Sequence, residues 1–272
     1  MKKYLYPILA VIVFLFMQAA AGIVIAVGGL VIHPELIEST KASGDPNTLM
    51  NSVGTDALAW AIAISGILTV GIIALLKMVD WKSVLNLKMI DWKWGIIGIM
   101  AAIIGIFALN IMEEMLDLPN LMEDTFLDMS NSVAGALCVG VVGPIIEEFI
   151  FREGVEGYML RNGVNKWVAI VGSALAFGII HLNPAQVPFA AAMGIILGII
   201  YYKSGNIVLT SILHILNNSI AVWQMYSMGE ELKDFSMVEW MGGQGVAIGS
   251  MAIGIAICFM LLRYFWKEYQ QQ

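Results

Sequence analysis

Long apolar runs alternate with short polar segments along almost the whole chain. Eight such runs lie near residues 6–32, 57–76, 94–112, 131–150, 166–182, 187–202, 206–226 and 244–265. A helix needs about 20 residues to cross about 30 Å of hydrocarbon, and most of the runs are that long. The two shortest runs, the fifth and sixth, are separated only by residues 183–186, whose sequence NPAQ is typical of a tight turn. The pattern predicts an all-α, polytopic transmembrane bundle of about eight helices, or six or seven if one run is re-entrant.

The composition supports a membrane protein. Hydrophobic residues make up 59% of the chain, charged residues only 13%, and the mean hydropathy is +0.82, whereas soluble domains are about 45 to 50% apolar and about 25% charged. The net charge of -7 comes without any basic cluster, so nucleic acid is not an expected partner. Cys138 and Cys258 lie within apolar runs and are expected to be packing residues. With no visible repeat, we expect residues 1–272 to form a single membrane-embedded domain.

The first apolar run allows two interpretations. It begins with Lys2 and Lys3 and contains three consecutive alanines, so it could be a cleavable signal peptide. The run continues through Ile32, however, well beyond the about 7 to 15 residues of a signal-peptide core. An uncleaved membrane anchor is therefore the favoured interpretation.

The positive charges predict the orientation, because Lys and Arg are retained on the cytoplasmic side of short loops. With the N-terminus inside, twelve of the 14 Lys and Arg residues are cytoplasmic, and only Lys41 and Lys233 lie outside. Both termini are then cytoplasmic. One external loop is acidic and carries Glu113, Glu114, Asp117, Glu123, Asp124 and Asp128. We interpret it as a solvated charged loop rather than a cation site.

Three polar clusters lie within the apolar runs of the second half of the chain. Ionisable groups in a span cost about 2.5 to 3.5 kcal/mol each on insertion scales, so they are candidates for function. The clusters are GPIIEEFIFREG with Glu147, Glu148 and Arg152, AFGIIHLNP with Phe177 and His181, and SILHILNNS with His214, Asn217 and Asn218.

The first cluster predicts one paired and one free carboxylate. Glu148 and Arg152 are spaced i, i+4, so they share a helical face and can form an ion pair. Glu147 points about 100° away and is free to face another neighbour. The alternative is a simple juxtamembrane charge cluster, since Glu153 and Glu156 follow closely. Pro144 is expected to kink this helix.

The second and third clusters place polar groups at a similar depth. His214 and Asn218 are spaced i, i+4 and share a face, whereas Asn217 points elsewhere and suits a helix–helix hydrogen bond. Counted from the nearest predicted turns, Glu147 and His181 lie about 23 and 27 Å along their helices, and His214 and Asn218 about 14 and 20 Å. Tilted helices can therefore bring all four side chains to one cavity, open to the cytoplasm.

These side chains suit the hydrolysis of an amide by activated water. A glutamate beside a neutral histidine can remove a proton from water, and a histidine with an asparagine amide can donate to an oxyanion. Alternatively, Glu147, His181 and His214 could hold a divalent ion such as zinc. The HExxH arrangement of helix-borne zinc peptidases is absent.

The three clusters together resemble the motifs of a known family. EEFIFR fits EExxxR, FGIIH fits FxxxH and HILNN fits HxxxN, in the order found in the CPBP intramembrane proteases. That family includes the type II CAAX prenyl proteases and the Abi-type bacteriocin-processing and immunity proteins. The resemblance covers a core at residues 130–222, with flanking transmembrane helices at 1–129 and 223–272.

The resemblance implies a function and a role for each motif residue. Glu147 and His181 would activate water, His214 and Asn218 would stabilise the oxyanion, and Glu148, Arg152 and Phe177 would support them. The expected partners are the lipid bilayer and a membrane protein or lipidated peptide, which need not be prenylated. We expect a multi-pass protein of a prokaryotic cell (inner) membrane, and the resemblance leaves open whether the peptidase needs metal.

Two alternatives from other classes remain at this point. Intramembrane Glu, His and Arg also form proton relays, so an ion-coupled transporter is one, although no repeated half is visible. A noncatalytic immunity protein that acts by binding is the other.

Overall fold

The computed structural model describes residues 2–32, 54–84, 86–87 and 90–269. The first half of the described chain contains α1 (Lys2–Ile32), α4 (Thr55–Leu75), α5 (Trp81–Val84), α6 (Trp92–Leu116) and α7 (Glu123–Ser130). One long interrupted helix follows, made of α8 (Val133–Leu137), η2 (Cys138–Val142), α9 (Gly143–Glu148), η3 (Phe149–Gly157) and α10 (Tyr158–Arg161). The rest comprises α11 (Lys166–Ile179), α12 (Gln186–Ser204), α13 (Ile207–Met228), η4 (Gly229–Asp234), α14 (Met237–Trp240) and α15 (Gln244–Glu268).

The described residues form only helices and connecting segments, without strands, which confirms the all-α prediction. In the part of the chain that the structure describes, seven helices are long and apolar enough to cross a membrane, and α11 is a shorter apolar helix. Each of the eight predicted runs corresponds to one of these eight helices. The protein is a multi-pass integral membrane protein.

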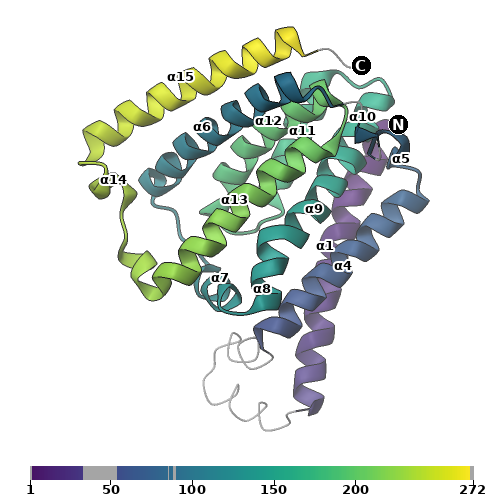
Figure 1. Cartoon of the computed structure of the whole chain (residues 1–272). Coiled ribbons are helices and arrows are strands. Elements are labelled where there is room, and N and C mark those ends of the chain that lie inside the picture. The colour runs from purple at the N-terminus through teal and green to yellow at the C-terminus, as the bar shows by residue number, and fades with distance from the viewer. Residues whose placement is uncertain (1, 33–53, 85, 88–89, 270–272) are drawn as a thin grey trace.

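The central helices surround the long interrupted helix. In Figure 1, α6 and α15 run side by side on one flank and α1 and α4 on the other. Between them, α11 packs against α12, and α13 packs against η2 and α9. The three polar clusters are therefore carried by neighbouring helices in the middle of the bundle.

The long helix is wider than an α-helix on both sides of α9. In η2 the backbone N–H of Gly143 bonds to the carbonyl of Cys138, five residues earlier. The next residue, Pro144, has no N–H to donate, so the wide turn falls where the α-helical ladder is interrupted. Such π-helical turns are frequent at functional sites, and here they flank the two glutamates of the first cluster.

Small residues bring α11 and α12 together. A Cβ added at Gly194 would lie 3.0 Å from the Cα of Ala174, and one added at Gly198 would lie 2.8 Å from Glu156 Oε2. These glycines therefore serve close packing within the bundle. A Cβ added at Gly28 on α1 would meet nothing within 4 Å.

The prediction of one acidic external loop is wrong in two respects. Glu113 and Glu114 belong to α6, and residues 123–130 form α7. Moreover, Glu114 accepts hydrogen bonds from Ser236 Oγ (2.6 Å) and from the backbone N–H groups of Met237 (3.0 Å) and Val238 (3.1 Å). This carboxylate fixes the start of α14 to the end of α6, a long-range contact that no local pattern reveals.

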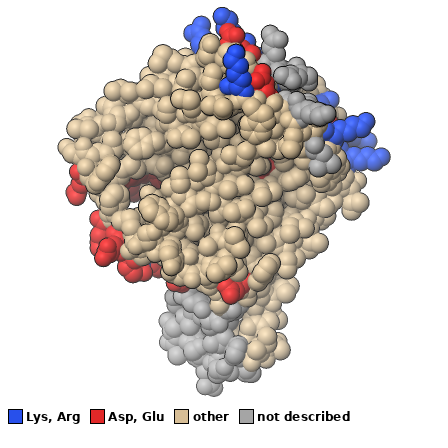
Figure 2. Space-filling model, viewed as in Figure 1, with Lys and Arg blue, Asp and Glu red and all other residues tan. Residues whose placement is uncertain are grey.

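Charge is unevenly distributed over the surface. Figure 1 shows both described ends of the chain at the same end of the bundle, and in Figure 2 the Lys and Arg residues of the visible face gather at that end. At the opposite end Lys233 pairs with Asp124 (2.7 Å) and Glu230 (2.6 Å). A cytoplasmic location for both termini stays a prediction, and Lys41 lies outside the described residues.

Candidate active site

The first cluster forms a buried ion pair, as the i, i+4 spacing predicts. Glu148 on α9 and Arg152 on η3 are both 0% exposed, and Arg152 Nε donates to Glu148 Oε2 at 3.2 Å. Arg152 Nη1 also donates to Ser173 Oγ on α11 at 3.3 Å. The serine hydroxyl in turn donates to the carbonyl of Phe151 at 2.8 Å. The pair is thus fixed from two helices.

His214 on α13 lies between the two adjacent glutamates. Its Nδ1 is 3.1 Å from Glu148 Oε1, and its Nε2 is 3.5 Å from Glu147 Oε2. Glu148 is ionised in its pair with Arg152, and an ionised carboxylate can only accept hydrogen bonds. We therefore place a proton on Nδ1 of His214, which makes Nδ1 the donor to Glu148. The contact therefore fixes the orientation of the ring and aims Nε2 at Glu147.

The two glutamates have different surroundings. Glu148 is fully buried among its partners, whereas the side chain of Glu147 is 21% exposed and faces His214, which is 2% exposed. A buried, fully paired carboxylate serves to orient its neighbours. The partly exposed carboxylate is the one that water and a substrate can reach.

Phe177 separates the two histidines. Its ring centroid lies 4.9 Å from that of His181 and 5.5 Å from that of His214, with both pairs nearly perpendicular. The Arg152 guanidinium lies 5.5 Å from the same ring. Phe177 is 1% exposed, so this aromatic side chain fills the centre of the candidate site and holds the histidines apart.

His181 presents a free ring nitrogen in its neutral form. It lies just beyond the end of α11, and its Nδ1 is 2.8 Å from the carbonyl oxygen of Phe177. A carbonyl oxygen can only accept, so Nδ1 donates the proton and Nε2 of the neutral ring is an acceptor. That nitrogen can accept a proton from water.

Asn218 joins α13 to the π-helical turn η2. Its Nδ2 donates to the carbonyl of Val139 at 3.1 Å, and its Oδ1 accepts from Asn217 Nδ2 at 3.0 Å. One N–H of the amide is used in the first contact, which leaves the other available. The helix–helix hydrogen bond expected of Asn217 is replaced by this bond to its own neighbour.

The sequence interpretation missed two buried acids on the same helix. The alternative interpretation placed Glu153 and Glu156 in a simple juxtamembrane charge cluster, whereas in the structure both are 0% exposed. Glu153 accepts from Tyr201 Oη (2.8 Å) and Arg161 Nη1 (3.0 Å). Glu156 follows Arg152 by one turn, and its Oε2 lies 3.8 Å from Arg152 Nη1. The i, i+4, i+8 spacing of Glu148, Arg152 and Glu156 is the signal that could have revealed it.

The residues offered as metal ligands do not form a metal site in this structure. Within the described ranges, no group of three His, Cys, Asp or Glu side chains is placed to hold a metal ion. Glu147, His181 and His214 are therefore not gathered as a ligand set.

Comparisons with known proteins point to the same segment. A family model described as type II CAAX prenyl endopeptidase Rce1-like matches residues 129–220. The putative membrane peptidase YdiL of Bacillus subtilis is 30% identical over 97 residues, which cover 35% of this chain and 39% of YdiL. The membrane-embedded CAAX protease MroQ of Staphylococcus aureus is 29% identical over 90 residues, which cover 31% of this chain and 36% of MroQ.

Each of these matches covers only part of this chain and part of the relative. The chain aligns with less than two fifths of the length of each of these curated relatives, and no solved structure matches it significantly. The matched segment nevertheless contains all three motifs. The central helices of this chain are thus similar to the Rce1-like type II CAAX prenyl endopeptidases, and the resemblance predicted from the three motifs is confirmed.

Proposed function

We propose that the protein is an intramembrane endopeptidase that hydrolyses a membrane-associated peptide or protein with activated water. One observation carries the proposal: Glu147 and His214 Nε2 face each other at 3.5 Å within a bundle of membrane-spanning helices, while buried Glu148 and Arg152 hold the imidazole from behind. The similarity to membrane peptidases supports it.

Glu147 is the proposed base. Its partly exposed carboxylate takes a proton from a water molecule, and the hydroxide attacks the carbonyl carbon of the scissile amide. His181 Nε2 is an acceptor in the neutral ring and orients the same water. When the tetrahedral intermediate collapses, the C–N bond breaks and the proton passes from Glu147 to the leaving amine. The reaction thus consumes one water and needs no covalent intermediate.

His214 and Asn218 are the proposed oxyanion donors. Since His214 Nδ1 donates to Glu148, an N–H at Nε2 requires the doubly protonated imidazolium. In that form His214 donates from Nε2 to the oxygen that becomes negative. Asn218 adds its second amide N–H, with the first fixed on Val139.

Arg152, Glu148 and Phe177 position these groups. The ion pair sets the orientation of the His214 ring, and the Phe177 ring packs against both histidine rings. We further propose that residues 130–222 form the catalytic core, that 1–129 and 223–272 flank it, and that cleavage occurs in the cytoplasmic half of the bilayer.

The test is cleavage of defined membrane peptides by the purified full-length protein in proteoliposomes. The panel contains prenylated and unprenylated versions of the same peptides, and wild type is compared with Glu147→Ala. We expect cleavage that disappears in the variant, while its helical content and elution from size-exclusion chromatography match wild type. Cleavage retained by Glu147→Ala would refute the role of this carboxylate. A parallel series with a chelator tests whether turnover needs metal.

A further inference from the structure

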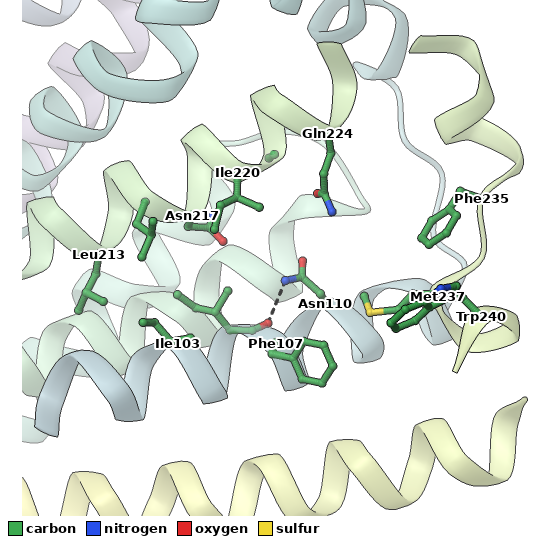
Figure 3. A pocket seen from close by; sticks show the side chains of 13 residues that line it. Ile103, Phe107, Asn110, Leu213, Asn217, Ile220, Gln224, Phe235, Met237 and Trp240 are labelled. Atoms are coloured by element: carbon green, nitrogen blue, oxygen red, sulfur yellow. Dashed lines mark hydrogen bonds between the residues drawn. The ribbon is translucent and has the colours of Figure 1, made fainter. Parts of the chain in front are cut away.

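A cavity of about 470 Å³ lies beside the candidate site, between α6, α13 and the segment that contains η4 and α14. Figure 3 shows α13 and α6 on its two long sides, with Phe235, Met237 and Trp240 at one end. The hydrogen bonds from the start of α14 to Glu114 fix that end wall to α6. The cavity is therefore a built feature of the fold.

The lining is apolar and uncharged but contains three carboxamides. Asn110 comes from α6, and Asn217 and Gln224 come from α13. In Figure 3, Asn110 and Gln224 extend toward the cavity from facing helices. Asn110 Nδ2 donates to Ile106 within its own helix at 3.1 Å, which leaves its amide oxygen as an acceptor. The lining residues include no Lys, Arg, Asp or Glu.

The cavity and the candidate active site share helix α13. Leu213 and Asn217 line it, and on the chain they directly precede His214 and Asn218. Asn217 also donates to Asn218. From Leu213 to Gln224 the lining follows α13 for eleven residues, or about 16 Å at about 1.5 Å per residue. An extended peptide of about five residues, at about 3.3 Å each, has that length.

We propose that this cavity binds an extended, uncharged segment of the substrate, about five residues long, adjoining the bond to be cleaved. The inference rests on the proposed function and adds the substrate class. The carboxamides carry it, because amide oxygens and N–H groups can pair with the N–H and C=O groups of a peptide backbone inside the membrane. An alkyl chain would offer these amides no further hydrogen bond, and a charged segment would find no counter-charge.

Binding can be tested without turnover. The full-length Glu147→Gln protein is placed in lipid nanodiscs. It is mixed either with a peptide of nine uncharged residues that has blocked termini and one photoreactive leucine, or with a photoreactive fatty acid, and is then illuminated. Mass spectrometry then locates the adducts. We expect the peptide to label the cavity residues Leu216, Ile220 or Trp240, and the same peptide with a central lysine to label them far less.

Variants of the carboxamides sharpen this test. Gln224→Leu and Asn110→Leu are each expected to weaken peptide binding about fivefold, because each removes hydrogen-bonding groups from the cavity. Gln18→Leu on α1, the same change on a distant helix, is the matched control and leaves binding unchanged. Size-exclusion chromatography identifies any carboxamide variant that misfolds. The lysine peptide and the uncharged peptide are compared on the same protein, so that comparison does not depend on the folding of these variants.

Three results would overturn the inference. They are peptide adducts spread equally over α1 and α15, peptide binding unaffected by either carboxamide variant, and displacement of the peptide by the fatty acid. The wild-type protein is assayed for cleavage of the same peptide. Cavity labelling without cleavage would count against the proposed function alone, and cleavage without cavity labelling against this inference alone.

Discussion

Replacing each of the two adjacent glutamates by glutamine should abolish cleavage in both cases, but should lower the stability of the fold much more at Glu148 than at Glu147. Glu148→Gln removes the carboxylate that faces both Arg152 Nε at 3.2 Å and His214 Nδ1 at 3.1 Å, in a place with 0% exposure. Removing one partner of a buried ion pair costs about 3 to 5 kcal/mol. We therefore expect Glu148→Gln to lower the free energy of unfolding by an amount in this range.

The same change at Glu147 should leave the fold almost intact. Its side chain is 21% exposed and its ion-pair contact is His214 at 3.5 Å, so we expect a loss below about 1 kcal/mol. Both variants should lose peptide cleavage. Glu147→Gln lacks the base, and Glu148→Gln no longer holds His214, a type of defect that lowers turnover about 10⁴-fold in a serine protease triad.

The stability of each variant is measured by SDS-induced unfolding in mixed micelles and its activity by cleavage of the peptide panel. Adding Arg152→Met to Glu148→Gln should recover much of the lost stability, because no unpaired charge is left buried. It should not recover activity. Equal destabilisation by the two single variants, or wild-type turnover by Glu148→Gln, would refute the division of roles.

Three further predictions concern packing and the oxyanion donors. Asn218→Ala should lower turnover about 10² to 10³-fold. Ser219→Ala also removes a hydrogen bond to η2, but it should retain wild-type turnover. Equal losses of turnover would indicate a structural role for both residues. Gly178→Ala should destabilise the fold by about 1 to 3 kcal/mol, because the new Cβ would lie 2.7 Å from a backbone oxygen. Gly28→Ala has open space around the new Cβ and should leave the stability unchanged in the same unfolding assay. Phe177→Ala should cost about 3 to 5 kcal/mol, since the ring is 1% exposed, and a cost below about 1 kcal/mol would contradict its central packing.

The membrane fold could be predicted from local composition. A span needs about 20 apolar residues whatever its neighbours are, so the runs near 57–76 and 244–265 correspond to α4 and α15. The i, i+4 pair of Glu148 and Arg152 was equally local, because it depends only on the helical repeat. These features need no knowledge of which helices touch.

The partners of the motif residues could not be predicted in that way. Spacing placed Glu147 and His214 at a similar depth, but the contact of His214 with Glu148 depends on the rotation of α13 against α9. Likewise, Asn218 donates to the carbonyl of Val139, which lies in the π-helical turn η2 of the facing helix. Side-chain contacts between helices depend on rotations and offsets that the sequence of one helix does not contain.

The sequence by itself determined that the chain is apolar enough to span a bilayer and that it carries three motifs with side chains suited to hydrolysis. The tertiary structure decided which carboxylate is buried and which is accessible, how Glu114 anchors α14, and where α6 and α13 enclose a cavity. The physical reason is that hydropathy and helical spacing act within one segment, whereas burial and cavities arise only when several segments pack together.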